Sequence, residues 1–325
     1  MKMLLAAVIH LLFFAIAVPA QSPVSVNRDA AAVKFVTSDI DNFWRAFDMA
    51  AKESDKAKKA AIYQSEYLDK GSDGLKDFIR LRIKTAESLA DIIEKNLKFY
   101  ASARPSTLQV TNMQKRMRKS FRKFKKIYPD AVFPNVYFMI GNTSTGGTTG
   151  PSGLLIGTEL YSKTAATPTE ELPVWLKVVL SPVDVLPAIV AHESCHHNQS
   201  LPRPVTVLEK SIQEGSCDLI SEIISGGNIN SAQKIYGDAR EAELWKEFAA
   251  DMSTTNIRNW MYNGVTAKDK PGDLGYYIGF KISQAYYRKA SDKKQAIRDI
   301  LNIKDFQRFY EASGYNGVSE NDKLP

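Results

Sequence analysis

Apolar residues at helical spacing dominate the first third of the chain. Ile40, Phe43, Trp44 and Phe47 lie on one face of a predicted helix for which Ser38 is a suitable N-cap. A second long helix is predicted over residues 75–93, after the break at Gly71–Gly74. The stretch from Met113 to Tyr128 repeats the helical period, so residues 27–129 are expected to form an N-terminal helical region.

The pattern changes to that of strands between residues 131 and 161. Val136–Ile140 and Leu154–Ile156 are short β-rich apolar runs, which predict two strands. The Gly, Thr and Ser residues of 141–153 predict a loop between them. This loop is not followed by Lys-Ser/Thr and a helix start, so it is not a phosphate-binding loop.

Two further helices follow, and a short Pro-rich link joins them. The first begins near Pro187 and ends near Gln199, because a helix does not continue through Pro202 and Pro204. The second is predicted over about 205–225 and is closed by Gly226 and Gly227. A later helix, 274–290, carries small residues at four-residue steps, which permits close packing against another helix.

The first of the two linked helices carries His192-Glu193-Ser194-Cys195-His196, an HExxH motif. Positions i and i+4 share one helix face, so the two imidazoles can bind one metal ion while Glu193 is free to act as a base. Three of the four histidines in the chain fall between positions 192 and 197, a clustering that packing alone does not require. Glu214 lies on the second helix and can reach the same metal, because the link between the helices is short.

These motifs carry a family resemblance. HESCH followed by EGSCD resembles the gluzincin class of zinc metallopeptidases, and QEGSCDLISEIISGG, FPNVYFMIGNTSTGGT and GYYIGFKISQAYYRKASDKKQAI resemble a family of predicted bacterial zinc-dependent proteases. The resemblance implies one zinc ion bound by His192, His196 and Glu214, with Glu193 as general base. Asp218 would orient a ligand histidine. The implied fold is α+β, mostly helical and zincin-like, with a small sheet beside the HExxH helix and a second ligand-bearing helix.

By the same resemblance, a tyrosine from a downstream helix would stabilise the oxyanion, and Tyr276 or Tyr277 is the candidate; either one is also a plausible core aromatic. Residues 153–161, GLLIGTELY, are expected to be either a substrate-binding edge strand or part of an ordinary core hairpin. The activity implied is hydrolysis of peptide or protein substrates by a zinc-activated water. The chain has no GxMEN motif, which favours an endopeptidase.

Two alternatives stay open. One is a secreted zinc-dependent hydrolase of another amide or ester, which the motif does not exclude. The other is a catalytically silent binding protein that contains zinc. Glu193 distinguishes them, because a structural site has no need of a base beside its ligand.

The N-terminus has the features of a secretory signal peptide. Lys2 precedes an apolar stretch from Leu4 to Val18, and cleavage is expected near Ala20. No cysteine follows that point closely, so a lipid-anchored form is not expected. We therefore predict a secreted or periplasmic protein with a signal peptide at 1–20, a helical region at 21–129 and the metal-binding region at 130–325, the last two forming one continuous unit.

Eleven Lys or Arg and no acid lie between Lys95 and Pro129. The helix predicted at 113–128 is therefore basic and amphipathic, and weak contact with an anionic surface is one interpretation. The other is a solvated face on a helix whose opposite side packs in the core. Nucleic acid is not expected as a partner, because secretion separates the protein from it.

The two cysteines flank the ligands. Cys195 follows His192 by three residues, and Cys217 follows Glu214 by three. Three helical steps place each thiol about 60° from its ligand, so the two can meet where the helices face each other. A disulfide is one expectation in an oxidising compartment; two buried thiols and a thiolate ligand are the others.

Overall fold

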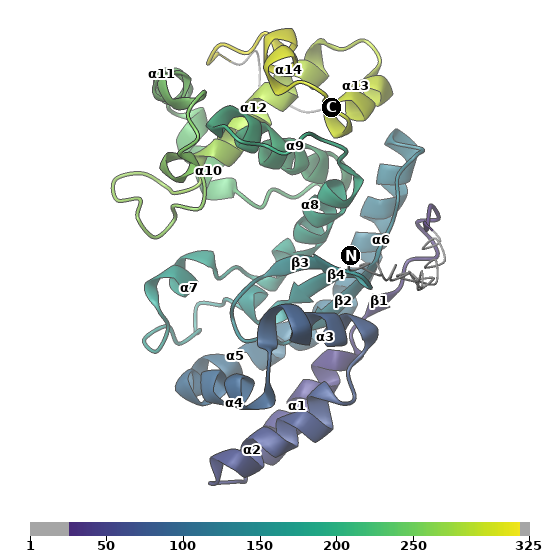
Figure 1. Ribbon diagram of the computed structural model, residues 1–325, viewed down its shortest axis with the longest axis vertical. Helices are drawn as coiled ribbons and strands as arrows, with labels where there is room; N and C mark the ends of the chain where they lie inside the picture. The colour runs from purple at the N-terminus through teal and green to yellow at the C-terminus, as the bar shows by residue number, and fades with distance from the viewer. Residues whose placement is uncertain (1–25, 319–325) are drawn as a thin grey trace, which may run out of the picture.

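The computed structural model describes residues 26–318 and shows a mostly helical chain around a small mixed sheet (Figure 1). The prediction of a mostly helical α+β fold is confirmed. The strands are β1 (Phe35–Val36), β2 (Asn135–Met139), β3 (Gly147–Gly150) and β4 (Gly153–Gly157). The N-terminal helices are α1 (Ser38–Ala50), α2 (Lys56–Tyr63), α3 (Asp73–Phe78), α4 (Ala86–Lys95), α5 (Leu97–Leu108) and α6 (Val110–Ile127).

The remaining helices follow the sheet in the chain. They are α7 (Val174–Val179), α8 (Leu186–Asn198), α9 (Val207–Ser225), α10 (Ser231–Asp238), α11 (Glu241–Asp251), α12 (Leu274–Lys289), α13 (Lys293–Leu301) and α14 (Phe306–Ser313). Two π-helical segments, η1 and η2, occupy Gln64–Leu68 and Ile79–Ile83. Short 3-10 turns, η3 to η5, occupy Thr158–Tyr161, Val183–Val185 and Ile257–Asn259.

The sheet has the order β1-β2-β4-β3. The first three strands in this order are parallel, and β3 pairs antiparallel with β4, with Gly147 opposite Ile156. Of the two expectations for residues 153–161, the substrate-binding edge strand is wrong, because β4 is interior and wholly buried, and the hairpin is present, because β4 pairs with β3. The edge strands are β1 and β3. Strand β3 lies within the stretch predicted as a loop, and its sequence, GTTG, lacks the apolar residues by which strands are recognised.

The long helix predicted over residues 75–93 is interrupted. Lys84 has φ 74°, and the helix that follows starts anew with the Thr85 side chain accepting a hydrogen bond from the Ser88 amide. A residue with positive φ cannot continue a right-handed helix. The apolar residues that predicted one long helix therefore belong to two separate helices.

Aromatic side chains join the N-terminal helices to the sheet. The Phe43 ring packs edge-on against Tyr67, with centroids 5.2 Å apart. The Tyr67 hydroxyl donates to the Ile140 carbonyl at 2.6 Å and accepts from the Ile140 amide at 3.2 Å. Buried side chains from α1 through α14 belong to one hydrophobic cluster, so the described residues on both sides of position 130 share a core.

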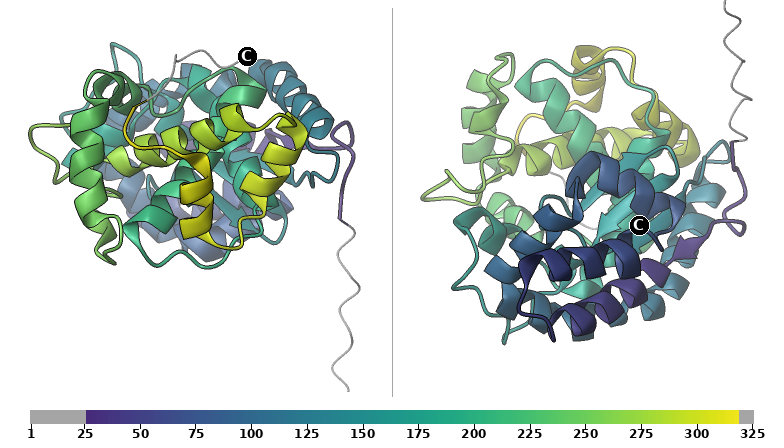
Figure 2. Two further views of the ribbon diagram at one scale, coloured as in Figure 1. Left: turned by 90° about the horizontal axis from the view of Figure 1, so that it is seen from above. Right: turned by 60° about the horizontal axis from the view of Figure 1, so that its bottom comes forward.

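The helix that carries Glu214 packs directly on α12. A Cβ atom at Gly279 would overlap the Ser211 carbonyl of α9, and one at Gly215 would overlap the Phe280 backbone. The close packing predicted from the small residues of α12 is therefore present. From the α9 side, Gly215 faces α12. In the view from above, α12 and its neighbours cross the top of the molecule (Figure 2, left).

Within residues 26–318 no helix has both the length and the apolar character that crossing a bilayer requires. The predicted signal peptide and its cleavage point near Ala20 lie outside the described residues.

A methyl group at position 279 tests the α9–α12 contact. We expect Gly279→Ala to lower the free energy of unfolding by about 2 kcal/mol or more, because backbone atoms of α9 must move to admit it. Gly264→Ala is the matched control, since the nearest atom to its new methyl group would lie 3.4 Å away, at ordinary contact distance. Equal urea midpoints for the two variants would show that the helices are not in backbone contact.

Glu159 is a buried carboxyl in the turn after β4. Its two oxygens accept from the amides of Gly141 (2.9 Å) and Thr143 (3.0 Å). Burial raises the pKa of Glu159 to about 7, despite these hydrogen bonds, which favour the charged form. The folded state therefore favours the neutral form of the Glu159 carboxyl.

This carboxyl predicts a pH dependence of stability. The pKa of Glu159 rises on folding from 4.5 to about 7, so its contribution is full below pH 4.5 and is lost as the pH rises to 7. The loss is about 3 kcal/mol. Urea unfolding across this range should show a shallower decline for Glu159→Gln than for the parent. Parallel profiles would contradict the assignment; the slopes are compared, because the amide itself forfeits one backbone hydrogen bond.

Candidate metal centre

Three potential ligands from α8 and α9 converge on one point. His192 Nε2 lies 3.0 Å from His196 Nε2, and Glu214 Oε2 lies 3.1 Å from His196 Nε2 and 3.5 Å from His192 Nε2. The two histidines are one helical turn apart on α8, and α9 supplies the carboxylate from the adjacent helix. These are the ligands predicted from the sequence, brought together as a group that could hold a metal ion.

The outer nitrogens of both imidazoles lie next to acceptor oxygens. His192 Nδ1 lies 2.8 Å from Asp218 Oδ1, and His196 Nδ1 lies 2.8 Å from Gln199 Oε1. Gln199 is oriented by its amide nitrogen, which donates to the Gln213 carbonyl at 2.9 Å. An acceptor beside Nδ1 places the proton there, so in each neutral ring Nε2 carries the lone pair.

Asp218 is fixed in turn by Asn230, whose amide nitrogen donates to Oδ2 at 2.6 Å. Burial disfavours the charged imidazole of His192, but Asp218 and Glu214 outweigh it and raise the pKa of His192 to about 10. Cationic charge at this point is therefore strongly favoured, whether a proton or a metal ion supplies it.

The second oxygen of Glu214 is also occupied. Lys210 Nζ donates to Oε1 at 2.7 Å, and the Tyr262 hydroxyl donates to it at 3.3 Å. Burial acts to raise the pKa of Glu214, but hydrogen bonds and charge from His192 and His196 hold that pKa well below its usual range. The carboxylate is thus ionised, with Oε2 directed at the histidines.

Glu193 lies beside the edge of the sheet. Its side chain is half-buried, and a Cβ atom at Gly147 would lie 3.2 Å from Glu193 Oε1. Strand β3 therefore runs past this carboxylate, next to α8.

The two candidate tyrosines differ in position. The Tyr276 ring lies beside His192, with centroids 6.4 Å apart, and burial raises its pKa well above the usual value. The Tyr277 hydroxyl instead donates to Asp238 Oδ1 on α10 at 3.1 Å, which directs it to a different partner from the three ligands.

The structure joins Cys195 and Cys217 in a disulfide, with their Cα atoms 5.4 Å apart. Both residues are wholly buried. The bond links α8 to α9 beside the ligands, so the two helices are tied covalently where they would share a metal.

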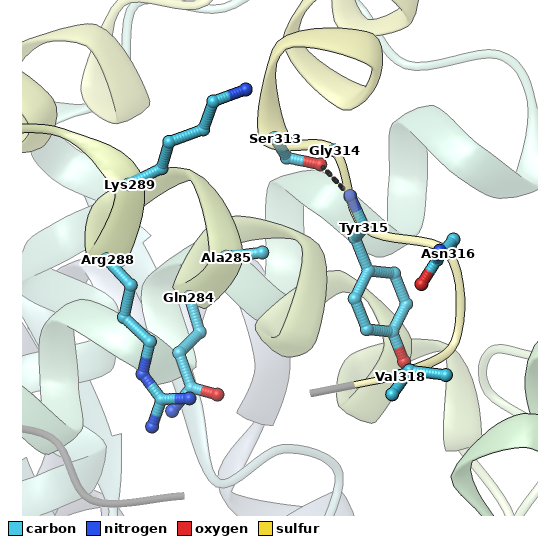
Figure 3. Close-up of a pocket in the computed structure, with 9 residues that line it drawn as sticks. All are labelled: Gln284, Ala285, Arg288, Lys289, Ser313, Gly314, Tyr315, Asn316 and Val318. Carbon is cyan, nitrogen blue, oxygen red and sulfur yellow. Dashed lines mark hydrogen bonds between the residues drawn. The ribbon is translucent and has the colours of Figure 1, made fainter. Parts of the chain in front are cut away.

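A pocket lies elsewhere in the described part of the chain. It has a volume of ≈ 540 Å³ between the C-terminal half of α12 and the segment after α14, and its lining includes Gln284, Arg288 and Tyr315 (Figure 3). It shares no residue with the three ligands.

Three residues that hold the ligands were not predicted: Gln199, Lys210 and Tyr262. Lys210 precedes Glu214 by four positions, the spacing at which side chains on one helix face meet, and this signal was present in the sequence. Gln199 lies at the predicted end of the HExxH helix, but its contact with His196 depends on the path of the chain after the helix and on the Gln213 carbonyl of α9. Tyr262 is 48 positions from Glu214, so no local pattern points to it.

Comparison with known proteins assigns the family. Residues 25–317 match the model of a lipoprotein family described as Gliding motility protein GldB. The chain belongs to the GldB family. No curated protein and no solved structure matches this GldB-family chain significantly.

This match corrects the functional prediction. It covers nearly the whole chain, HESCH and EGSCD included, and the family is one of motility proteins and not of peptidases. The interpretation as a gluzincin-type metallopeptidase, and hence as a zinc-dependent protease enzyme, is wrong. That interpretation alone assigned Glu193 as general base and Tyr276 or Tyr277 to the oxyanion.

The family also bears on location. A lipoprotein family belongs to the exported proteins of the cell envelope, in agreement with the exported location predicted here. In this GldB-family chain the two cysteines stand at 195 and 217.

The disulfide predicts a mass-spectrometric result. Alkylation of the denatured, unreduced protein should label neither Cys195 nor Cys217, and reduction should expose both. Because the bond closes a separation of 22 residues, replacing both cysteines by serine should lower the free energy of unfolding by about 3 kcal/mol. Two labelled cysteines without reductant would contradict the pairing.

Proposed function

We propose that this protein is an exported, non-catalytic component of the gliding-motility machinery, in which one zinc ion bound by His192, His196 and Glu214 fixes α8 against α9. The supporting observation is the convergence of two Nε2 atoms and one carboxylate oxygen at separations of 3.0 to 3.5 Å. Two lone pairs and an anion repel one another at such distances unless a proton or a metal ion lies among them, and the proposal assigns that place to zinc.

The donor set favours zinc over the hard cations. Imidazole nitrogens with one carboxylate oxygen are usual zinc ligands, whereas Ca²⁺ takes six to eight oxygens. Zinc–ligand bonds of about 2.0–2.1 Å in a tetrahedral arrangement separate the ligand atoms by about 3.3 Å. The three separations in this protein bracket that value.

The surroundings support a structural role for the ion. Asp218 and Gln199 hold the outer nitrogens, Lys210 and Tyr262 hold the outer carboxylate oxygen, and the disulfide ties the same two helices. A metal there would join helices that the chain itself connects by a Pro-rich link. We keep the zincin-like arrangement as a description of the geometry, without an activity.

The proposal includes the location. Cleavage near Ala20 would release the protein into the periplasm or beyond, where the disulfide persists. A partner would then meet a surface whose shape depends on the bound ion.

Substitutions of two glutamates, one a ligand and one beside the ligands, separate metal binding from catalysis. We expect Glu214→Ala to weaken zinc retention about a hundredfold or more and to lower the unfolding temperature, because it removes a ligand. Glu193→Gln is the control and should retain zinc, since its side chain is not among the ligands. The measurements are metal content after dialysis and thermal unfolding with and without chelator.

The same variants test the non-catalytic role. In a gliding host that lacks its own copy, Glu193→Gln should restore gliding as the parent does, and Glu214→Ala should fail. Loss of gliding in Glu193→Gln with its zinc intact would overturn the non-catalytic proposal. Full zinc retention in Glu214→Ala would overturn the ligand set instead.

A further inference from the structure

Helix α6 carries an unbalanced positive charge. Its residues 110–127 include eight Lys or Arg and no acid. One face is apolar and packs in the core through Met117, Phe121 and Phe124, all fully buried. The charge is therefore concentrated on the outward half of the helix.

Four cations form a straight row on that outward face. Lys115, Lys119, Arg122 and Lys126 follow one another by four, three and four positions, and all four are exposed. These steps keep them within an arc of about 60° and spread them over about 16 Å of the helix axis. We call them the α6 row.

The α6 row has no ion pair or hydrogen bond to any described residue, whereas its neighbours do. Arg116 pairs with Asp184 at 3.6 Å, and Arg118 donates to the Val33 carbonyl at 3.0 Å. The charges of the α6 row are therefore not neutralised by ion pairs with the described residues.

The placement of α6 fits a membrane-facing side. The described chain enters the fold here: Arg28 donates to the Asp130 carbonyl just past the end of α6, and the Phe35 ring packs on Phe121 with centroids 5.7 Å apart. The described part of the chain therefore begins beside this helix. Figure 1 shows α6 along one side of the molecule and α7 on the other side.

We propose that the α6 row binds the anionic headgroups of a membrane surface and orients the protein on it. A linear row of cations on a rigid helix matches a plane of negative charge, and each cation near such a surface strengthens binding about fivefold. Helix α6 packs against α8 and α9, so in this orientation it lies between the bilayer and those two helices. The inference does not depend on a bound metal.

Vesicle sedimentation of the exported chain, from Gln21 onward, tests the proposal. The parent should bind vesicles of phosphatidylcholine mixed with phosphatidylglycerol and not vesicles of phosphatidylcholine alone, with binding that falls as salt rises. The variant K115Q/K119Q/R122Q/K126Q should bind at least about tenfold more weakly. The matched control K52Q/K58Q/K177Q/K268Q removes the same charge from exposed lysines outside α6 and should bind as the parent does.

Lysine footprinting provides a readout that needs no variant. Acetylation of Lys115, Lys119 and Lys126 in the parent should be suppressed by the anionic vesicles, while Lys52 and Lys177 stay reactive. Any of three results would overturn the proposal. These are equal protection of all five lysines, equal loss of vesicle binding in the two quadruple variants, and binding to soluble dextran sulfate without binding to vesicles.

Discussion

The backbone contact between α9 and α12 fixes the position of the ligand-bearing helix. Gly215 and Gly279 let the two helices approach until main chain meets main chain, and Glu214 is the residue next to that contact. Because backbone atoms cannot move aside as a side chain can, the Cα of Glu214 has little freedom relative to α12. The carboxylate reaches the histidines of α8 from this fixed base, and the disulfide and the surrounding hydrogen bonds refine a geometry already set.

Local periodicity made most of the helices predictable. The ends of α8 and α9 follow from prolines and Gly226, and the burial of Met117, Phe121 and Phe124 follows from their spacing. The failures occur where long-range pairing overrides local preference. Strand β3 is four polar or glycine residues that become a strand because β4 offers them a partner, and Lys84 breaks a helix that its apolar period alone would continue.

The metal centre shows the same division between local and long-range information. His192 and His196 share a helix face by spacing alone, and Glu214 follows from a short link between helices. Gln199 depends on where α8 ends, and Tyr262 depends on the path of a distant loop. The error about activity has another cause. An HExxH motif predicts that two imidazoles lie on one helix face, but it does not predict that a substrate binds there. The same arrangement of ligands can serve to hold two helices together.

The disulfide also determines which metals the centre could admit. Cys217 Sγ lies 3.5 Å from the outer nitrogen of His196, so in a reducing environment a soft thiol would stand beside this ligand. Thiolates attract copper(I) and compete for zinc in the cytosol, where metal supply differs from that of the envelope. Oxidation withdraws both sulfurs from coordination and leaves only nitrogen and oxygen donors. Under the proposed zinc binding, the metal would therefore meet nitrogen and oxygen donors only after the cysteines had been oxidised.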